Sequence, residues 1–239
     1  MIVNGAKGKM GQLAIKNLTN DPSFEVVGQL GKEASLFDEI KKTHAQVVVD
    51  LTNAEVVLKN TQAIIKAGAH PVIGTSGLLK EQVADLQKQC QSLKLGGVIA
   101  PNFSVGAVLM MKYAAEAAHY FSDVEIIEMH HDGKLDSPSG TAVRSAELIA
   151  ATRQAVPKEK AMREVVKGAR GAHYQNIPIH AIRLPGLVAH QQIIFGGLGE
   201  TLTFKHDSID RQCFMSGILL ACRKVMTLDK LVYGLEHLL

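Results

Sequence analysis

The chain of 239 residues has few cysteines, few aromatic residues and no long hydrophobic run. Its three cysteines, Cys90, Cys213 and Cys222, are odd in number and none lies at CxxC spacing, which argues against a disulfide framework and favours a reduced, cytoplasmic protein. No apolar stretch approaches the length of a bilayer span, and we expect no targeting sequence at the amino terminus. We therefore predict neither a membrane protein nor a secreted one.

The charge balance also excludes a class of partners. The formal net charge is +3, and no basic run is interleaved with aromatic residues. A nucleic-acid partner is therefore not expected. The sequence has neither an internal repeat nor a low-complexity segment, and its length with 46% hydrophobic residues favours one or two domains with substantial cores.

The amino-terminal residues have the pattern of a dinucleotide-binding loop. A short apolar strand, Met1 to Val3, leads directly into GAKGKMG at Gly5 to Gly11, and apolar residues then recur at helical spacing. Glycines at such a turn let the backbone approach a pyrophosphate, which binds at the helix N-terminus. The spacing is GxxGxxG rather than the commoner GxGxxG, but its position between strand and helix predicts nucleotide binding.

Alternating strands and helices continue to about residue 103. Strands are expected at Val26-Val27, at 47–49, at Val72-Ile73 and at 97–99, with helices at 54–67 and from Leu79 to Cys90. This alternation predicts a parallel sheet with right-handed crossovers, and ligands bind at the carboxyl ends of such strands. The turns at that edge are candidate cofactor contacts, although Thr52 and Asn102 are also ordinary turn residues; they are Gly5, Thr52, Gly74 and Asn102.

The regular alternation of strands and helices ends after Phe103. A helix at 105–119 is followed by expected strands at 164–167, 179–183, 192–195 and 200–205, with a polar, mobile loop at 168–175. We predict an α+β domain with a mixed, open sheet; because open sheets make subunit contacts, we expect a homo-oligomer. A final apolar helix at 211–226 is expected to return to the first domain.

The segment EIIEMHHDGKLDSPSGTA, residues 125–142, carries most of the chemistry. An apolar strand ends in His130 and His131, and Lys134 follows three residues later. Ser139 is a natural N-cap for a helix, and the N–H groups around Gly140 and Thr141 would attract a carboxylate or a phosphate. Imidazole, ammonium and helix N–H groups together indicate an anionic substrate that gains or loses a proton.

This segment has two other interpretations, an ordinary exposed surface and a metal site. Histidines and lysines are most often solvated surface residues, and a Ser-capped helix is often only that. A metal site is not expected, because neighbouring strand residues point to opposite faces and no further Cys or His lies at ligand spacing. Gly133 and Pro138 also prevent a helix from placing His130 and Lys134 on one face.

Taken together, these motifs resemble the dihydrodipicolinate reductases of bacterial lysine and diaminopimelate biosynthesis. The resemblance runs nearly end to end, with GAKGKMG, DLT, GTSG, APNFS and the His-His segment in order. It implies an NADH- or NADPH-binding Rossmann-like domain at 1–103 and 212–239, and a substrate-binding and oligomerisation domain at 104–211. It also implies a cyclic dicarboxylate substrate, hydride reduction followed by protonation, closure of the two domains, and a homotetramer.

The resemblance also assigns roles to residues. It makes His130 a proton donor and acceptor and Lys134 a proton donor. It places the substrate carboxylates on His131, Lys134 and the helix start at Ser139, Gly140 and Thr141. The cofactor contacts that it implies are Gly5, Ala6, Lys7, Gly8, Lys9, Met10, Thr52, Gly74, Thr75, Ser76, Ala100, Pro101, Asn102 and Phe103, with Arg211 and Phe214 where the chain re-enters the first domain.

The chain departs from the family pattern at several positions. Lys9 replaces the usual Arg, GTSG replaces GTTG, DSPSGTA replaces DAPSGTA, and the segment between Leu30 and Val47 is short. Gly31 stands where an acid would bind the NAD ribose, and Lys32 follows it, so we expect NADPH to be used at least as well as NADH. Glu33 has the opposite effect: if it reaches the ribose hydroxyls in place of Lys32, NADH is favoured.

Two other functions are compatible with this fold: a non-catalytic NADP-binding sensor and another amino-acid dehydrogenase.

Overall fold

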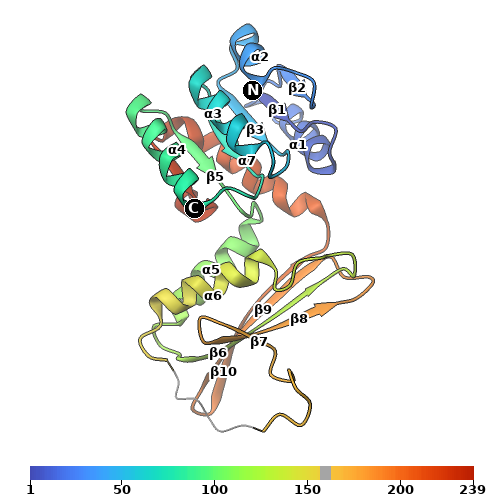
Figure 1. Ribbon diagram of the computed structural model, residues 1–239, viewed down its shortest axis with the longest axis vertical. Coiled ribbons are helices and arrows are strands. Elements are labelled where there is room, and N and C mark those ends of the chain that lie inside the picture. The colour runs from blue at the N-terminus through green and yellow to red at the C-terminus, as the bar shows by residue number, and fades with distance from the viewer. Residues whose placement is uncertain (157–162) are drawn as a thin grey trace. The chain divides into compact units, whose positions relative to one another are not determined.

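The computed structural model describes residues 1–156 and 163–239, which form two units (Figure 1). The first unit comprises residues 1–105 and 211–239, and the second comprises residues 106–210. Within the described residues, no helix combines the length and the apolar character that a membrane span requires.

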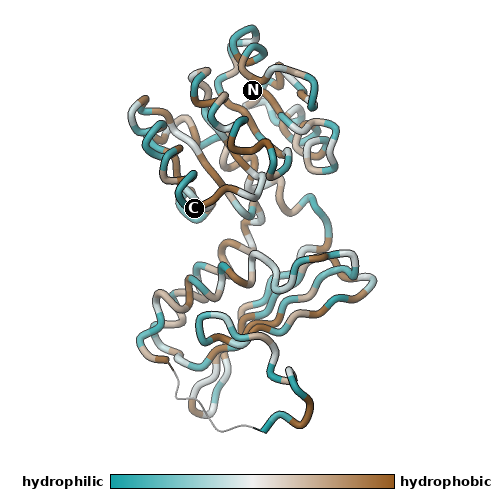
Figure 2. The backbone as a smooth tube through the Cα atoms, viewed as in Figure 1, coloured by the Kyte–Doolittle hydropathy of each residue, from teal (hydrophilic) through white to brown (hydrophobic). Residues whose placement is uncertain are grey.

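The first unit contains a six-stranded sheet in the order β11-β5-β4-β3-β1-β2, and all its pairings are parallel. Its central strands are apolar and buried, as expected for a sheet covered on both faces (Figure 2). The predicted parallel sheet is therefore confirmed. The strands are β1 (Ile2–Asn4), β2 (Gly28–Leu30), β3 (Val47–Asp50), β4 (His70–Ile73), β5 (Gly97–Ile99) and β11 (Leu231–Tyr233).

The helices of this unit form two groups. Three of them pack in sequence, α2 (Leu36–Thr43) on α3 (Val57–Ala67) and α3 on α4 (Lys80–Leu93). The other group is α1 (Lys9–Thr19) packed on α7 (Met215–Lys224). The strand order reverses between β1 and β3, which is where ligands bind in open α/β sheets.

Several local predictions in this unit were wrong. The second strand begins at Gly28, because Val27 donates its N–H to the oxygen of Met1 before the regular ladder starts. Helix α2, which begins after the N-cap Ser35, and strand β11 were not predicted. The helix expected at 211–226 is three pieces: a 3-10 helix (Arg211–Phe214), α7, and a second 3-10 helix (Val225–Thr227).

The second unit is a mixed five-stranded sheet covered on one face by helices α5 (Val105–Ala117) and α6 (Gly140–Thr152) (Figure 1). Thr152 joins the two helices by donating its hydroxyl to the oxygen of Ala115, 2.8 Å away. The sheet order is β10-β9-β6-β8-β7, in which only β6 and β8 pair in parallel. Its strands are β6 (Asp123–His130), β7 (Ala172–Tyr174), β8 (Ile177–Arg183), β9 (Ala189–Gly197) and β10 (Glu200–Ser208).

The segment before β8 differs from the prediction. Residues 164–167 form a bend that leads into a turn rather than a strand, because the Glu164 carboxylate accepts the N–H groups of Gly168 and Arg170. The expected loop at 168–175 instead contains β7, which pairs with β8 across a tight turn. Gln175 and Asn176 have φ of 55° and 57° at that turn, the conformation of a two-residue hairpin.

Candidate active site

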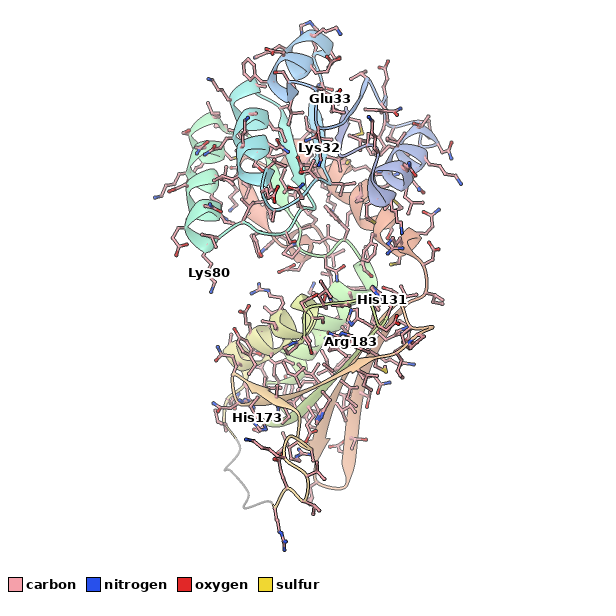
Figure 3. The ribbon with its side chains drawn as sticks, turned by 45° about the vertical axis from the view of Figure 1, so that its right-hand side comes forward. Lys32, Glu33, Lys80, His131, His173 and Arg183 are labelled. Atoms are coloured by element: carbon pink, nitrogen blue, oxygen red, sulfur yellow. The ribbon has the colours of Figure 1, made fainter. Side chains whose placement is uncertain are left out.

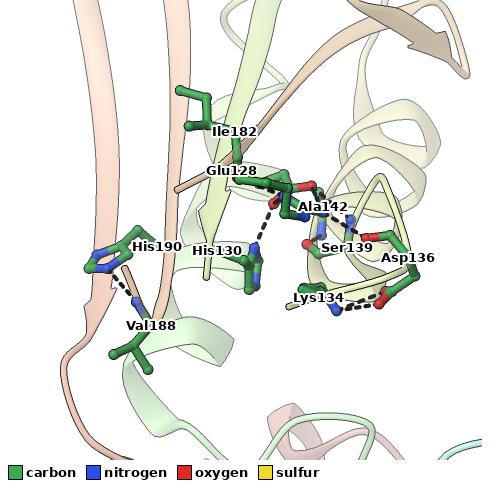
Figure 4. Close-up of polar contacts among 10 residues, drawn as sticks. Glu128, His130, Lys134, Asp136, Ser139, Ala142, Ile182, Val188 and His190 are labelled. Carbon is green, nitrogen blue, oxygen red and sulfur yellow. Dashed lines mark hydrogen bonds and ion pairs between the residues drawn. The ribbon is translucent and has the colours of Figure 1, made fainter. Parts of the chain in front are cut away.

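The candidate site is built around Glu128, a fully buried carboxylate on β6. One of its oxygens accepts a hydrogen bond from His130 Nδ1 at 2.6 Å (Figure 4). Two guanidinium nitrogens of Arg183, on the neighbouring strand β8, donate to the same carboxylate at 2.8 Å each. The backbone N–H of Ser139 donates to it at 3.1 Å, so Glu128 joins β6, β8 and the start of α6.

These contacts set the charges of the two central groups. Burial alone would raise the pKa of Glu128, but the hydrogen bonds from Arg183 and His130 outweigh burial and lower it, so the carboxylate is ionised. Burial also lowers the pKa of His130 below its usual range, although Glu128 opposes that effect. The imidazole therefore releases a proton more readily than an exposed histidine does.

Lys134 lies in the loop between β6 and α6 and is paired with Asp136. Its Nζ is 2.7 and 2.8 Å from the two carboxylate oxygens (Figure 4). This hydrogen bonding lowers the pKa of Asp136. Because Asp136 is exposed and Lys134 is partly buried, a bound carboxylate can replace Asp136 on the ammonium without leaving a buried charge unpaired.

Ser139 caps helix α6 as predicted. Its Oγ accepts a hydrogen bond from the N–H of Ala142 at 3.2 Å. A Cβ built on Gly140 would meet nothing within 4 Å, so the first turn has open space beside it. One turn further along α6, Ser145 Oγ accepts a hydrogen bond from the side-chain amide of Gln191 at 2.7 Å and donates to the backbone oxygen of Thr141 at 2.8 Å. The helix start therefore offers room and a fixed backbone for an anion.

His131 does not join the Glu128 cluster. It follows His130, the last residue of β6, and its side chain is exposed. Figure 3 shows it near Arg183 in the second unit. The two adjacent histidines thus have different environments, one anchored and partly buried and the other exposed.

The sequence interpretation missed Glu128, Arg183 and Asp136. A signal for Glu128 was present, since it shares the buried face of β6 with Val124 and Ile126. A charged residue at a core position of a strand indicates a buried ion pair or a functional group. Arg183 has no such local signal.

In the first unit, a cavity of about 1160 Å³ lies at the β1/β3 edge. Of the predicted cofactor residues, those that line it are Gly5, Lys7, Gly8, Lys32 and Thr52. Gly5 has φ of 88°, and a Cβ there would lie 2.5 Å from the oxygen of Leu51, so only glycine fits this turn. Helix α1 begins after Gly8 with no side-chain cap, which leaves its N-terminus suited to a pyrophosphate.

A second buried carboxylate, Asp50, organises the turns beside this cavity. It accepts hydrogen bonds from the side chains of Asn4 and Asn60 at 2.8 Å each, and from the hydroxyls of Thr52 and Thr75 at 2.6 and 2.8 Å. The hydroxyls of Thr52 and Thr75 therefore hold the loop shape. Because these hydroxyl protons are donated to Asp50, a hydrogen bond that Thr52 or Thr75 donates to a cofactor would come from its backbone N–H.

The other predicted cofactor residues are spread over three places. Ala6, Lys9 and Met10 belong to the glycine turn and the first turn of α1. A second group follows β4 and β5, where a Cβ on Gly74 would lie 2.7 Å from the Phe103 ring, so Gly74 packs against Phe103. That group is Gly74, Thr75, Ser76, Ala100, Pro101, Asn102 and Phe103, and Arg211 and Phe214 lie at the two ends of the 3-10 helix before α7.

Comparison with known proteins agrees with this geometry. Family models described as "Dihydrodipicolinate reductase, N-terminus" and "Dihydrodipicolinate reductase, C-terminus" match residues 1–103 and 106–239. The chain belongs to the dihydrodipicolinate reductase family. Proteins named 4-hydroxy-tetrahydrodipicolinate reductase from Legionella pneumophila and Coxiella burnetii are each 55% identical to it, over 100% of this chain and 98% of theirs.

A solved structure extends the comparison to three dimensions. A dipicolinate-bound dihydrodipicolinate reductase from Paenisporosarcina sp. TG-14 is 44% identical, with a TM-score of 0.92 over 100% of this chain and 98% of that one. A probable dehydrogenase from Thermotoga maritima, 11% identical with a TM-score of 0.63 over 99% and 91%, shares the fold alone. As a member of this family, the protein is an oxidoreductase that uses a nicotinamide dinucleotide.

Proposed function

We propose that this protein reduces 4-hydroxy-tetrahydrodipicolinate to tetrahydrodipicolinate in lysine and diaminopimelate biosynthesis. The full-length relatives at 55% identity have this reductase name. The observation that carries the proposal is the Glu128-anchored His130 in the same segment as Lys134 and the start of α6. This arrangement supplies a proton and binds carboxylates, both of which the reduction of a cyclic dicarboxylate requires.

The substrate carboxylates would bind at the second unit. Lys134 is available to one of them once Asp136 is displaced. The N–H groups of Gly140 and Thr141, next to the N-cap Ser139, suit another at the uncrowded helix start. His131 is the exposed imidazole that completes the proposed set. Dipicolinate, which is bound to the related structure, has the same pair of carboxylates on a flat ring.

The cofactor would bind at the β1/β3 edge of the first unit. The reduced nicotinamide supplies the hydride when it is bound. Gly5 and Gly8 would let the backbone approach its pyrophosphate at the uncapped start of α1. His130 and Lys134 would then deliver the proton that balances the hydride, and the 4-hydroxyl group of the substrate leaves as water, so the protein itself needs no nucleophile.

We propose that NADPH is used at least as well as NADH. Lys7 and Lys32 both line the cavity, and a Cβ on Gly31 would lie only 4.0 Å from Lys7 Nζ. Two ammonium groups therefore lie around the position where an acid would bind the ribose. Glu33 also lines the cavity and lies beside Lys32 after β2, so the preference is expected to be moderate (Figure 3).

We also propose a cytoplasmic homotetramer assembled through the second unit. Helices α5 and α6 cover one face of its sheet, and the opposite face includes Ile127, Ile194 and Ile182, the last with 36% of its surface exposed. An open sheet face with apolar residues favours contact with another copy. Sedimentation velocity tests this assembly: a monomer at micromolar concentration would contradict it.

A coupled assay tests the proposed activity. Dihydrodipicolinate synthase generates the substrate in situ, and nicotinamide oxidation is followed by absorbance with NADPH and with NADH. We expect oxidation that depends on the synthase, on its two substrates and on this protein. A non-catalytic sensor would bind NADPH without oxidising it, and a different amino-acid dehydrogenase would not respond to the synthase product.

A further inference from the structure

Glu128 has more hydrogen-bond partners than its charge requires. A buried carboxylate is costly unless it is paired, and Arg183 already pairs it through two hydrogen bonds of 2.8 Å. The bonds from His130 and from the Ser139 N–H are additional. They come from the two parts of the site that the proposed reaction uses, the proton carrier and the carboxylate-binding helix start.

The short contact with His130 determines which ring nitrogen is protonated. An ionised carboxylate only accepts hydrogen bonds, so the 2.6 Å contact requires a proton on His130 Nδ1. Nε2 is then the nitrogen that gains and loses a proton. When Nε2 gives its proton to the substrate, the imidazole becomes neutral with its remaining proton on Nδ1, and Glu128 stays ionised.

The same carboxylate holds the helix start in place. Its other oxygen accepts the N–H of Ser139, the N-cap of α6. On the neighbouring strand, Gln191 lies directly opposite Glu128 and holds the next turn through Ser145. A shift of Glu128 would therefore move the imidazole and the first turn of α6 together.

We propose that Glu128 is a positioning residue of the reductase: it fixes the Nδ1–H form of His130 and couples that imidazole to the carboxylate-binding start of α6. This inference rests on the proposed function, in which His130 exchanges the proton and α6 binds the substrate. The simpler alternative is that Glu128 and Arg183 are only a structural ion pair, with no effect on proton transfer.

The charged groups around His130 predict the direction of a pH effect. They are Glu128 on β6, Arg183 on β8, and Lys134 in the following loop, which is itself paired with Asp136. Burial lowers the pKa of His130, Glu128 raises it, and Lys134 and Arg183 lower it. Replacing Glu128 by a neutral residue removes the group that raises this pKa, so the pKa must fall. If the reaction needs protonated His130, its rate declines as the pH rises through this pKa. That alkaline decline then begins at a lower pH in the variant.

Strand β6 also offers a matched control. Glu125 lies on the opposite face of the strand and binds an arginine and a histidine, Arg170 and His180, but it contacts neither His130 nor α6. The experiment compares pH profiles of kcat and kcat/KM for Glu128→Gln and Glu125→Gln. For Glu128→Gln we expect kcat to fall roughly 100-fold and the alkaline limb of kcat/KM to move about one pH unit lower. For Glu125→Gln we expect kcat within roughly twofold of wild type and an unmoved limb.

Two results would overturn the inference: a Glu128→Gln enzyme whose alkaline limb of kcat/KM stays at the wild-type pH, or an alkaline limb that shifts equally in both variants.

If Glu128→Gln does not fold, ¹⁵N NMR of the histidine rings in the wild-type protein gives the answer, with His130→Asn used for assignment. Neutral His130 is expected with its proton on Nδ1; a proton on Nε2 would refute the role of Glu128. A wild-type protein without reductase activity would refute the proposed function instead, and the NMR result does not depend on that activity.

Discussion

The ammonium of Lys134 is held by both carboxylate oxygens of Asp136, at 2.7 and 2.8 Å. In the proposed function, the substrate carboxylate competes with Asp136 for this ammonium. Replacing Asp136 by Asn should therefore lower the KM for substrate a few-fold, since an exposed ion pair contributes about 1 kcal/mol or less. Steady-state kinetics test this in a double-mutant cycle: in a Lys134→Ala background, the same Asp136→Asn change should have no effect on KM.

Removing the ammonium itself should have a larger effect. Lys134→Ala is expected to lower kcat/KM by roughly 100- to 1000-fold, because a charge-assisted contact used in the transition state is lost. Lys205→Ala is the matched control, since Lys205 also pairs with an aspartate two residues later, Asp207, at 2.9 Å. Circular dichroism should show both variants folded. Wild-type kcat/KM in Lys134→Ala would remove this residue from the mechanism.

The start of α6 should bind one carboxylate of a planar inhibitor. Pyridine-2,6-dicarboxylate is expected to inhibit competitively with respect to substrate. Thr141→Pro deletes a backbone N–H in the first helical turn, where proline is tolerated, and should raise the inhibition constant about tenfold. Thr141→Ala keeps that N–H and should change the constant little. Competition with the nicotinamide cofactor alone would place the compound elsewhere.

The cavity beside Gly31 should determine the choice of cofactor. We expect kcat/KM with NADPH to exceed that with NADH by no more than roughly tenfold, because the cationic contact is exposed. Lys32→Glu should shift the ratio toward NADH. Lys80→Glu makes the same charge change at the start of α4, away from the lining of the cavity, and should leave the ratio unchanged (Figure 3). A strong NADH preference that Lys32→Glu does not alter would show that this turn does not bind the 2′-phosphate.

The parts of the fold that local patterns specify were predicted well. The glycine turn before α1, the buried strand β3 and the Ser139 cap of α6 each depend on a few adjacent residues. The short elements α2, β7 and β11 were missed. The turn that closes β7 onto β8 uses Gln175 and Asn176 in place of the usual glycine, so its sequence gave only a weak hairpin signal.

The polar clusters could not be derived in the same way. Glu128 and Arg183 are 55 positions apart, and they meet only because β6 and β8 are adjacent with His130 opposite Arg183. Asp50 likewise collects partners from Asn4 and Thr75, which follow or end other strands. Periodicity predicts that a strand exists and which face is buried, but it does not specify which strands are neighbours or in which register.

Transfer of hydride to the proposed substrate can be measured directly. The protein is incubated with the product of dihydrodipicolinate synthase and with NADPH that carries deuterium at the transferable position of the nicotinamide ring, and the ring product is analysed by mass spectrometry. The proposed function predicts tetrahydrodipicolinate that contains one deuterium atom, formed at a rate that Lys134→Ala lowers. Turnover that yields no deuterium in this product, or no turnover with either cofactor, would contradict it.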